Sequence, residues 1–137
     1  MSQVFISHSS KDKKIAERVV KGLAENGIKP WISHREIPAG HPDWDEAITS
    51  AIKESAVLVL LLSESSAQSP EVATEVKMAR ERRIPYIPVV LQSSVQLGDR
   101  LVYALQGVQR LDWNLSSTRI PKRHIQALVT VLQLNRP

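Results

Sequence analysis

The chain has 137 residues, the size of one domain that buries about two-thirds of the surface of its unfolded form. It contains no cysteine, which excludes disulfide bonds, thiolate metal sites and cysteine nucleophiles. The net charge is +4, but the basic residues after Asp99 are dispersed and do not alternate with aromatic residues, so we expect no direct nucleic-acid contact. No apolar stretch is long enough to span a bilayer, and the apolar pattern begins at Val4 without a signal peptide. We therefore expect a cytoplasmic protein with no membrane partner.

The first predicted unit is a strand followed by a helix. Residues 4–7, V-F-I-S, predict a short buried strand that ends in a polar turn. Apolar residues at helical spacing then predict an amphipathic helix, which Asn26 and Gly27 end with a left-handed cap. Residues 29–33, K-P-W-I-S, predict the second strand.

A long loop is expected after the second strand. Residues 34–42 contain two prolines and a glycine, which are incompatible with regular secondary structure. Connections in α/β units usually have about two to six residues, and longer ones are often functional. A helix beginning at Pro42 or Asp43 and ending near Ser55 is predicted to follow.

The rest of the chain is organised around residues 57–62, V-L-V-L-L-L. This unbroken apolar run is typical of a central strand in a parallel sheet that is covered on both faces. A serine-rich loop over residues 63–69 then leads to a helix, with Ser69 as N-cap and Pro70 in the first helical position. The loop lies at the carboxyl end of a central strand, which is where open α/β sheets bind ligands.

Two further strands and a final helix complete the pattern. Strands are predicted over 86–91 and 108–113, with a weakly indicated short helix near 97–105 between them, and Pro121 begins the last helix. Because strands alternate with helices, we predict an α/β fold in which residues 1–137 form a single flavodoxin-like domain. Its five-stranded parallel sheet would have helices on both faces.

Glu75 is the main catalytic candidate. Val72, Val76 and Ala79 form the apolar stripe of the third long helix, and at ~100° per residue Glu75 lies about 60° from the centre of this stripe. A half-shielded carboxylate near the strand end could stabilise positive charge developing on a ligand. The alternative is an ordinary solvent-exposed helical glutamate, the usual environment of a charged residue.

Five segments, in their order along the chain, carry a resemblance to a known family. They are V-F-I-S-H-S-S-K-D at 4–12, I-P-A-G at 37–40, W-D-E-A-I-T-S-A-I at 44–52, V-L-V-L-L-L-S at 57–63 and I-P-V-V-L at 87–91. The set resembles the TIR (Toll/interleukin-1 receptor) domain in its bacterial form, in which these segments are the first box, the BB loop, the second helix and the third and fourth strands. The resemblance covers nearly the whole chain and implies the TIR fold.

The TIR family contains both NAD-cleaving enzymes and protein-interaction modules. In the enzymes a glutamate early in the third helix is catalytic, and the resemblance implies this role for Glu75. In the cleavage of the nicotinamide–ribose bond the leaving group is already cationic before the bond breaks and needs no protonation, while oxocarbenium character develops on the sugar, which a carboxylate stabilises. NAD+ would then be the substrate, with no cofactor and no metal. The products would be nicotinamide and either ADP-ribose or a cyclic ADP-ribose isomer.

The resemblance also implies substrate contacts around Glu75. At the end of the first strand, Ser7, His8 and Ser9 would line the ribose or phosphate region, although these serines could instead cap the following helix. Candidates on other elements are Ser33, Arg35, Gly40, Trp44, Ser69 and Glu71.

The BB loop region supplies three of these candidates, each with an alternative role. Arg35 would meet a phosphate or remain a solvated loop residue. Trp44 would stack on a base or pack in the core, and Gly40 would serve loop geometry. The histidines of this loop are not held on one helical face, so no metal site is expected.

Two positions depart from the family pattern. Glu71 stands where many catalytic members have a tryptophan, and Ser33 stands where many have an aspartate. Acids one helical turn apart repel modestly, so Glu71 would either tune the site of Glu75 or show that the site has drifted.

Three functions remain open. The first is an NAD+ glycohydrolase or cyclase in bacterial antiphage immunity or cell-death signalling, activated by self-assembly through the BB loop and third helix, with a sensor or effector domain as a further partner. The second is a non-catalytic TIR–TIR adaptor, which Glu71 in place of the aromatic favours. The third is a nucleoside deoxyribosyltransferase with a glutamate nucleophile, against which the BB-loop motif argues.

Overall fold

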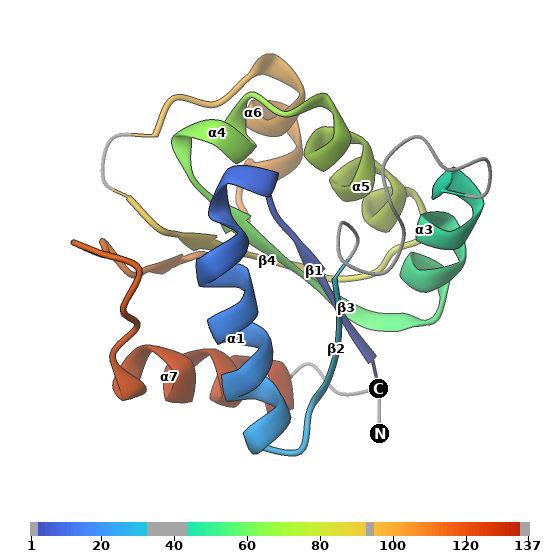
Figure 1. Cartoon of the computed structure of the whole chain (residues 1–137). Helices are drawn as coiled ribbons and strands as arrows, with labels where there is room; N and C mark the ends of the chain where they lie inside the picture. The colour runs from blue at the N-terminus through green and yellow to red at the C-terminus, as the bar shows by residue number, and fades with distance from the viewer. Residues whose placement is uncertain (1–2, 33–43, 93–94, 135–137) are drawn as a thin grey trace.

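The computed structural model describes residues 3–32, 44–92 and 95–134. Within these residues the chain forms a five-stranded parallel sheet with the strand order β2-β1-β3-β4-β5, and helices pack on both faces (Figure 1). The predicted α/β fold and parallel sheet are therefore confirmed. The strands are β1 (Gln3–Ser7), β2 (Lys29–Ile32), β3 (Ser55–Leu62), β4 (Tyr86–Val90) and β5 (Leu111–Asp112).

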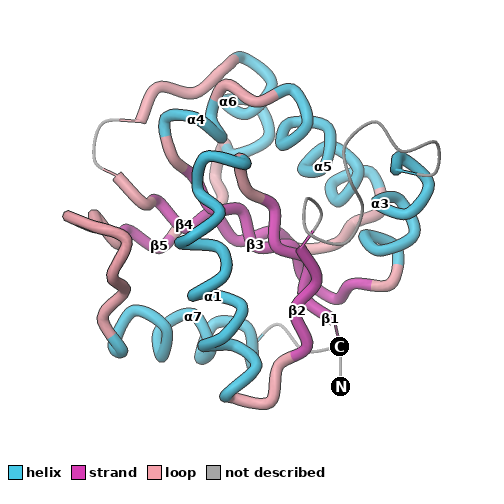
Figure 2. The backbone as a smooth tube through the Cα atoms, in the orientation of Figure 1, coloured by secondary structure: helices cyan, strands magenta, loops and turns pink. Residues whose placement is uncertain are grey.

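The helices form two layers. On one face of the sheet lie α1 (Lys13–Glu25), which follows the short 3-10 helix η1 (Ser10–Asp12), and α7 (Lys122–Leu134). The other face is covered by α3 (Trp44–Lys53), α4 (Glu64–Ala67), α5 (Pro70–Glu81) and α6 (Asp99–Leu105), as Figure 2 shows. No helix among the described residues has the length and apolar character needed to cross a membrane.

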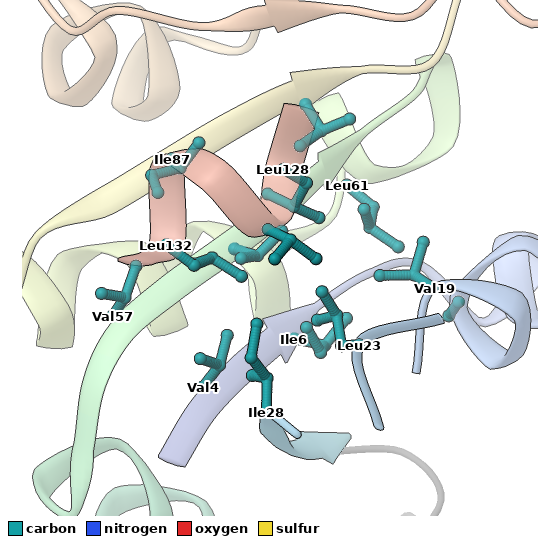
Figure 3. Close-up of a cluster of buried hydrophobic side chains, with 14 of the residues drawn as sticks. Val4, Ile6, Val19, Leu23, Ile28, Val57, Leu61, Ile87, Leu128 and Leu132 are labelled. Carbon is teal, nitrogen blue, oxygen red and sulfur yellow. The ribbon is translucent and has the colours of Figure 1, made fainter. Parts of the chain in front are cut away.

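Strand β3 contributes to the cores on both faces of the sheet. Val57, Val59 and Leu61 pack with α1 and α7, whereas the alternate leucines 58, 60 and 62 pack with α3, α5 and α6. Figure 3 shows the first core, with Leu128 of α7 and Leu23 of α1 gathered over the sheet. Successive side chains of a strand point to opposite faces, so an unbroken apolar run is what a strand between two helical layers requires.

The predicted start of α5 and the predicted end of α1 are confirmed. Ser69 Oγ accepts a hydrogen bond from the Val72 backbone N–H at 3.3 Å, and Pro70 occupies the first position of α5, where no backbone donor is needed. At the end of α1, Gly27 has φ 75°, and its N–H donates to Ala24 O.

The serine-rich segment over 63–69 differs from the predicted loop, because it contains the one-turn helix α4. Ser63 Oγ accepts from the Ser66 N–H at 3.1 Å, while Ser66 Oγ accepts from the Ser63 N–H at 2.8 Å. This reciprocal capping box satisfies donors that a helix start leaves unpaired. Serines that suggested a loop therefore build a helix.

The fifth strand is also shorter than the predicted range 108–113. Only Leu111 and Asp112 pair with β4, opposite Val89 and Val90; the residue of β4 before them is Pro88, which has no N–H to donate to a ladder. The short helix predicted near 97–105 is present as α6. The second predicted helix ends at Lys53, slightly before the expected Ser55, which instead begins β3.

Candidate active site

Glu75 lies where α5 packs against the carboxyl end of β1. Ser7, the last residue of β1, donates from Oγ to Glu75 Oε1 at 2.6 Å. The exposed fractions are 0% for Ser7 and 2% for Glu75, so the expected half-shielded position was wrong and the carboxylate is buried. The buried face of α5 is wider than its apolar stripe, since it includes Ala73 as well as Glu75. The serine hydroxyl supplies a polar partner under this face.

The Ser7–Glu75 contact has the geometry of a charge-assisted hydrogen bond. An O–H donor to a carboxylate oxygen typically lies about 2.5–2.7 Å away. Burying a carboxylate costs free energy unless hydrogen bonds compensate for the lost water. A buried acid at the ligand-binding edge of a parallel sheet is therefore a functional candidate with a physical rationale.

His8 and Ser9 follow directly and have different roles. The His8 ring is buried, with 2% exposure, and its Nδ1 lies 2.8 Å from Ser9 O. A carbonyl oxygen only accepts, so Nδ1 carries the proton in this arrangement. Ser9 is the N-cap of η1, and its Oγ accepts from the Lys11 N–H at 3.2 Å. Ser9 thus caps the short helix before α1, whereas Ser7 binds Glu75.

Ser69 and Glu71 lie at the start of the helix that carries Glu75. Ser69 is half-buried and its Oγ is engaged as the N-cap of α5. Glu71 is exposed, one turn before the buried Glu75. The two carboxylates therefore occupy different environments, although the sequence places them on the same side of the helix.

A second polar contact at this sheet edge had no sequence signal. Ser63, which follows β3, donates from Oγ to Asp12 Oδ2 of η1 at 2.5 Å, across 51 residues. Ser66 Oγ also lies 2.8 Å from Leu61 O and donates to it. The turn after β1 and the segment after β3 are thereby tied together, as expected for loops at one carboxyl edge. The spacing of Ser63 and Ser66 could have indicated the capping box, but nothing local indicates Asp12.

The remaining candidates belong to the segment between β2 and α3. Ser33, Arg35 and Gly40 lie outside the described residues, as does the predicted loop over 34–42. Trp44 is the first residue of α3, but its side chain is likewise outside the description. Within the described parts, no group of three or more His, Asp or Glu side chains could hold a metal ion.

Comparison with known proteins identifies the family. Among solved structures, a Toll-related receptor TIR domain from Hydra magnipapillata, TRR-2, matches with TM-score 0.73 and 17% identity over all of both chains. The TIR domains of the activated Roq1 resistosome, which recognises the pathogen effector XopQ, match with TM-score 0.69 and 18% identity, covering 96% of this chain and 99% of theirs.

A third solved structure is an enzyme. The CMP N-glycosidase BcmB of Clostridium botulinum matches with TM-score 0.66 and 17% identity, covering 94% of this chain and 98% of its own. The search of curated proteins gives no match. A sequence model of the TIR domain matches residues 4–129, nearly the whole chain, and the chain therefore belongs to the TIR domain family.

Proposed function

We propose that the protein is an NAD+ glycohydrolase or cyclase with Glu75 as its catalytic carboxylate. The observation that carries the proposal is the buried hydrogen bond from Ser7 Oγ to Glu75 Oε1, 2.6 Å long, at the carboxyl edge of the sheet. Both residues match positions that the TIR resemblance marks as functional. In this proposal residues 1–137 act as one TIR domain, in the cytoplasm.

The chemistry fits one buried carboxylate. The bond between C1′ of the ribose and the nicotinamide nitrogen breaks, and its electron pair leaves with nicotinamide, which departs neutral. Positive charge then develops on the sugar, where a preoriented carboxylate in a dry site stabilises it. Ser7 would fix the orientation of Glu75 by holding Oε1. Water at C1′ gives ADP-ribose, and attack by the adenine ring gives a cyclic isomer.

The structural likeness supports a reaction class, cleavage of an N-glycosidic bond, but it does not indicate which nucleotide is the substrate. BcmB is named as a CMP N-glycosidase, and its reaction, like the one proposed here, cleaves a glycosidic bond to nitrogen. At 17% identity this likeness concerns the fold, so CMP enters as a competing substrate to be tested beside NAD+.

Burial of Glu75 suggests how activity is controlled. With 2% exposure, the carboxylate has almost no contact with solvent in the isolated chain. We infer that assembly with other TIR domains, through the BB loop and α5, opens the site to substrate. A role in bacterial antiphage or cell-death signalling, with a sensor or effector domain as a further partner, belongs to the same proposal. The resistosome TIR domains are solved as part of an activated immune assembly, which is consistent with it.

The test is chromatography of NAD+ after incubation with protein clustered on beads, beside Glu75→Gln and the matched control Glu81→Gln, which changes an exposed glutamate of the same helix. We expect nicotinamide release by the native chain, a loss of about a hundredfold or more in Glu75→Gln, and retained activity in Glu81→Gln. The second product peak distinguishes hydrolysis from cyclisation. Release of cytosine from CMP, with NAD+ left intact, would show that the substrate is CMP and would overturn the assignment of NAD+.

A non-catalytic TIR–TIR adaptor is the second candidate. Its support is that Ser7 and Glu75 together make a buried link between β1 and α5, which is also what a purely structural pair would do. Under this reading clustered protein leaves both nucleotides intact. Glu75→Gln then lowers only the free energy of unfolding, measured by urea denaturation. A deoxyribosyltransferase would instead exchange bases on a deoxynucleoside.

A further inference from the structure

A hollow lies between α5 and α6. It has a volume of about 420 Å³, and its lining includes Ala73 from α5 and Ala104 from α6. These two small residues are nearly buried, with exposures of 9% and 8%. Their short side chains leave space between the helices where larger ones would fill it. Volumes of about 300–1,000 Å³ are typical of small-molecule sites.

The hollow is lined by an excess of positive charge. Lys77, Arg80 and Arg100 contribute three cations, against the single acid Asp99. Lys77 and Arg100 are exposed, and within residues 3–32, 44–92 and 95–134 neither side chain makes a hydrogen bond or ion pair. Two unpaired cations from opposite walls therefore remain available to an anion.

The third cation is held in place by an aromatic ring. The Arg80 guanidinium carbon lies 4.3 Å above the centroid of the Tyr103 ring. The contact with Tyr103 raises the pKa of Arg80, and the neighbouring guanidinium lowers the pKa of Tyr103. A stacked guanidinium keeps several N–H donors directed away from the ring, in the planar arrangement that suits phosphate.

We infer that this hollow, named here the α5–α6 groove and defined by residues 73, 77, 80, 99, 100, 103 and 104, binds a phosphate-bearing ligand of mononucleotide size. The phosphate is held by the three cations, and the sugar and base lie over the alanine floor. Arginine pairs with phosphate through two parallel hydrogen bonds, and lysine contributes a point charge.

The groove is separate from the Glu75 site but uses the same helix. Ala73 faces α6, whereas Glu75 faces Ser7 at the end of β1. Residues two apart on a helix point about 200° apart around its axis. A ligand in the groove therefore contacts α5 on the side away from Glu75. The inference goes beyond the proposed function and does not depend on NAD+ cleavage.

An acidic protein segment is the other chemistry that matches the charge. Binding of an extended acidic segment requires a row of basic side chains that is longer than the hollow. Acidic residues interrupt such a row on both helices. Glu81 follows Arg80 directly at the end of α5, and Asp99 precedes Arg100 on α6. The compact volume and the apolar floor favour a small ligand.

The experiment is calorimetric titration of the whole chain with AMP, and separately with inorganic phosphate and with adenosine. We expect AMP to bind about tenfold or more tightly than either part alone, because both the phosphate and the base contribute. Lys77→Gln with Arg100→Gln should weaken AMP binding about tenfold or more, since charged hydrogen bonds to the phosphate are lost. Asp99→Asn should strengthen it.

The matched control is Lys53→Gln with Lys122→Gln, which removes the same charge from exposed positions on α3 and α7. AMP binding should change less than about twofold in this control. An equal loss in both double variants would show only general attraction to a basic protein and would overturn the inference. So would an absence of AMP binding, with or without binding of an oligoglutamate peptide.

AMP is also part of NAD+, so one further variant separates the two sites. Glu75→Gln should bind AMP as the native chain does, even if it has lost NAD+ cleavage. Loss of AMP binding in Glu75→Gln, with binding kept in the Lys77 and Arg100 double variant, would place the nucleotide at the Glu75 site and overturn the inference.

Discussion

Ser7 Oγ lies 2.6 Å from Oε1 of Glu75, a residue 68 positions further along the chain. The contact joins the last residue of an interior strand to the first half of α5, and both side chains are buried. It makes the carboxylate part of the folded core as well as a candidate for chemistry. Variants at this pair therefore affect stability and activity in ways that can be separated.

Ser7→Ala removes the donor and leaves the buried Glu75 oxygen without it. We expect the free energy of unfolding to fall by about 1–3 kcal/mol, measured by urea denaturation. Under the proposed function, kcat for NAD+ cleavage should fall more than KM rises, since Glu75 is no longer oriented. Ser10→Ala is the control, because Ser10 is an exposed serine of the same turn. Equal effects of the two variants would contradict a special role for Ser7.

Asp12→Ala removes the acceptor of the Ser63 hydroxyl. The hydrogen bond joins the turn after β1 to the end of β3, and its loss should cost about 1–2 kcal/mol of unfolding free energy. Asp12→Asn keeps a carbonyl acceptor and should cost less. A double-mutant cycle with Ser63→Ala measures the coupling, and additive single effects would show that the contact contributes nothing.

Gly22→Ala tests the close packing of α1 on α7. A Cβ at Gly22 would lie 2.9 Å from Ile125 Cγ2, a β-branched side chain with little rotamer freedom. Alanine gains about 0.5–1 kcal/mol of helix propensity, but overpacking costs about 1–3 kcal/mol. We expect net destabilisation by thermal unfolding. In an Ile125→Ala background the same change should stabilise instead. Stabilisation by Gly22→Ala in the native chain would contradict the close packing of α1 on α7 at this position.

Arg80→Gln should raise the pKa of Tyr103 towards its ordinary value. The guanidinium lowers this pKa by favouring the phenolate, so the native protein should form tyrosinate at a lower pH than the variant. Ultraviolet absorbance during an alkaline titration measures this in a Tyr86→Phe background, which leaves Tyr103 as the only tyrosine. The control Arg82→Gln removes an exposed charge nearby. A titration unchanged by Arg80→Gln would contradict the stacked arrangement.

The elements with strong local signals could be predicted from the sequence. The apolar run of β3 and the Ser69–Pro70 start of α5 have direct physical causes within a few residues, and the structure has both. The length of β5 could not be predicted in this way, because residues 108–110 depend on partners in β4, where Pro88 has no N–H to donate. The presence of a strand can be predicted from the local sequence, whereas the length of β5 depends on its pairing with the neighbouring strand.

The candidate site also has one part that the sequence predicts and another part that it does not. Glu75 could be selected from its place on α5, but its burial depends on Ser7, which no periodicity links to it. The Asp12–Ser63 contact is equally distant in sequence. Serines are also ambiguous, since the same residue type is a loop former or a helix cap according to its partners. The pattern after β3 therefore predicts a loop, although residues 64–67 form α4.

The position of β1 in the sheet has a consequence during synthesis. β1 precedes β2 and β3 in the sequence, yet it lies between them in the sheet. At about 5–20 residues per second, the ribosome needs roughly 3–11 s to add the residues from Ser7 to Leu62, where β3 ends. Until then, one edge of β1 in the nascent chain has no strand to pair with. A chaperone that shields residues 3–7 during this interval should therefore raise the yield of native protein.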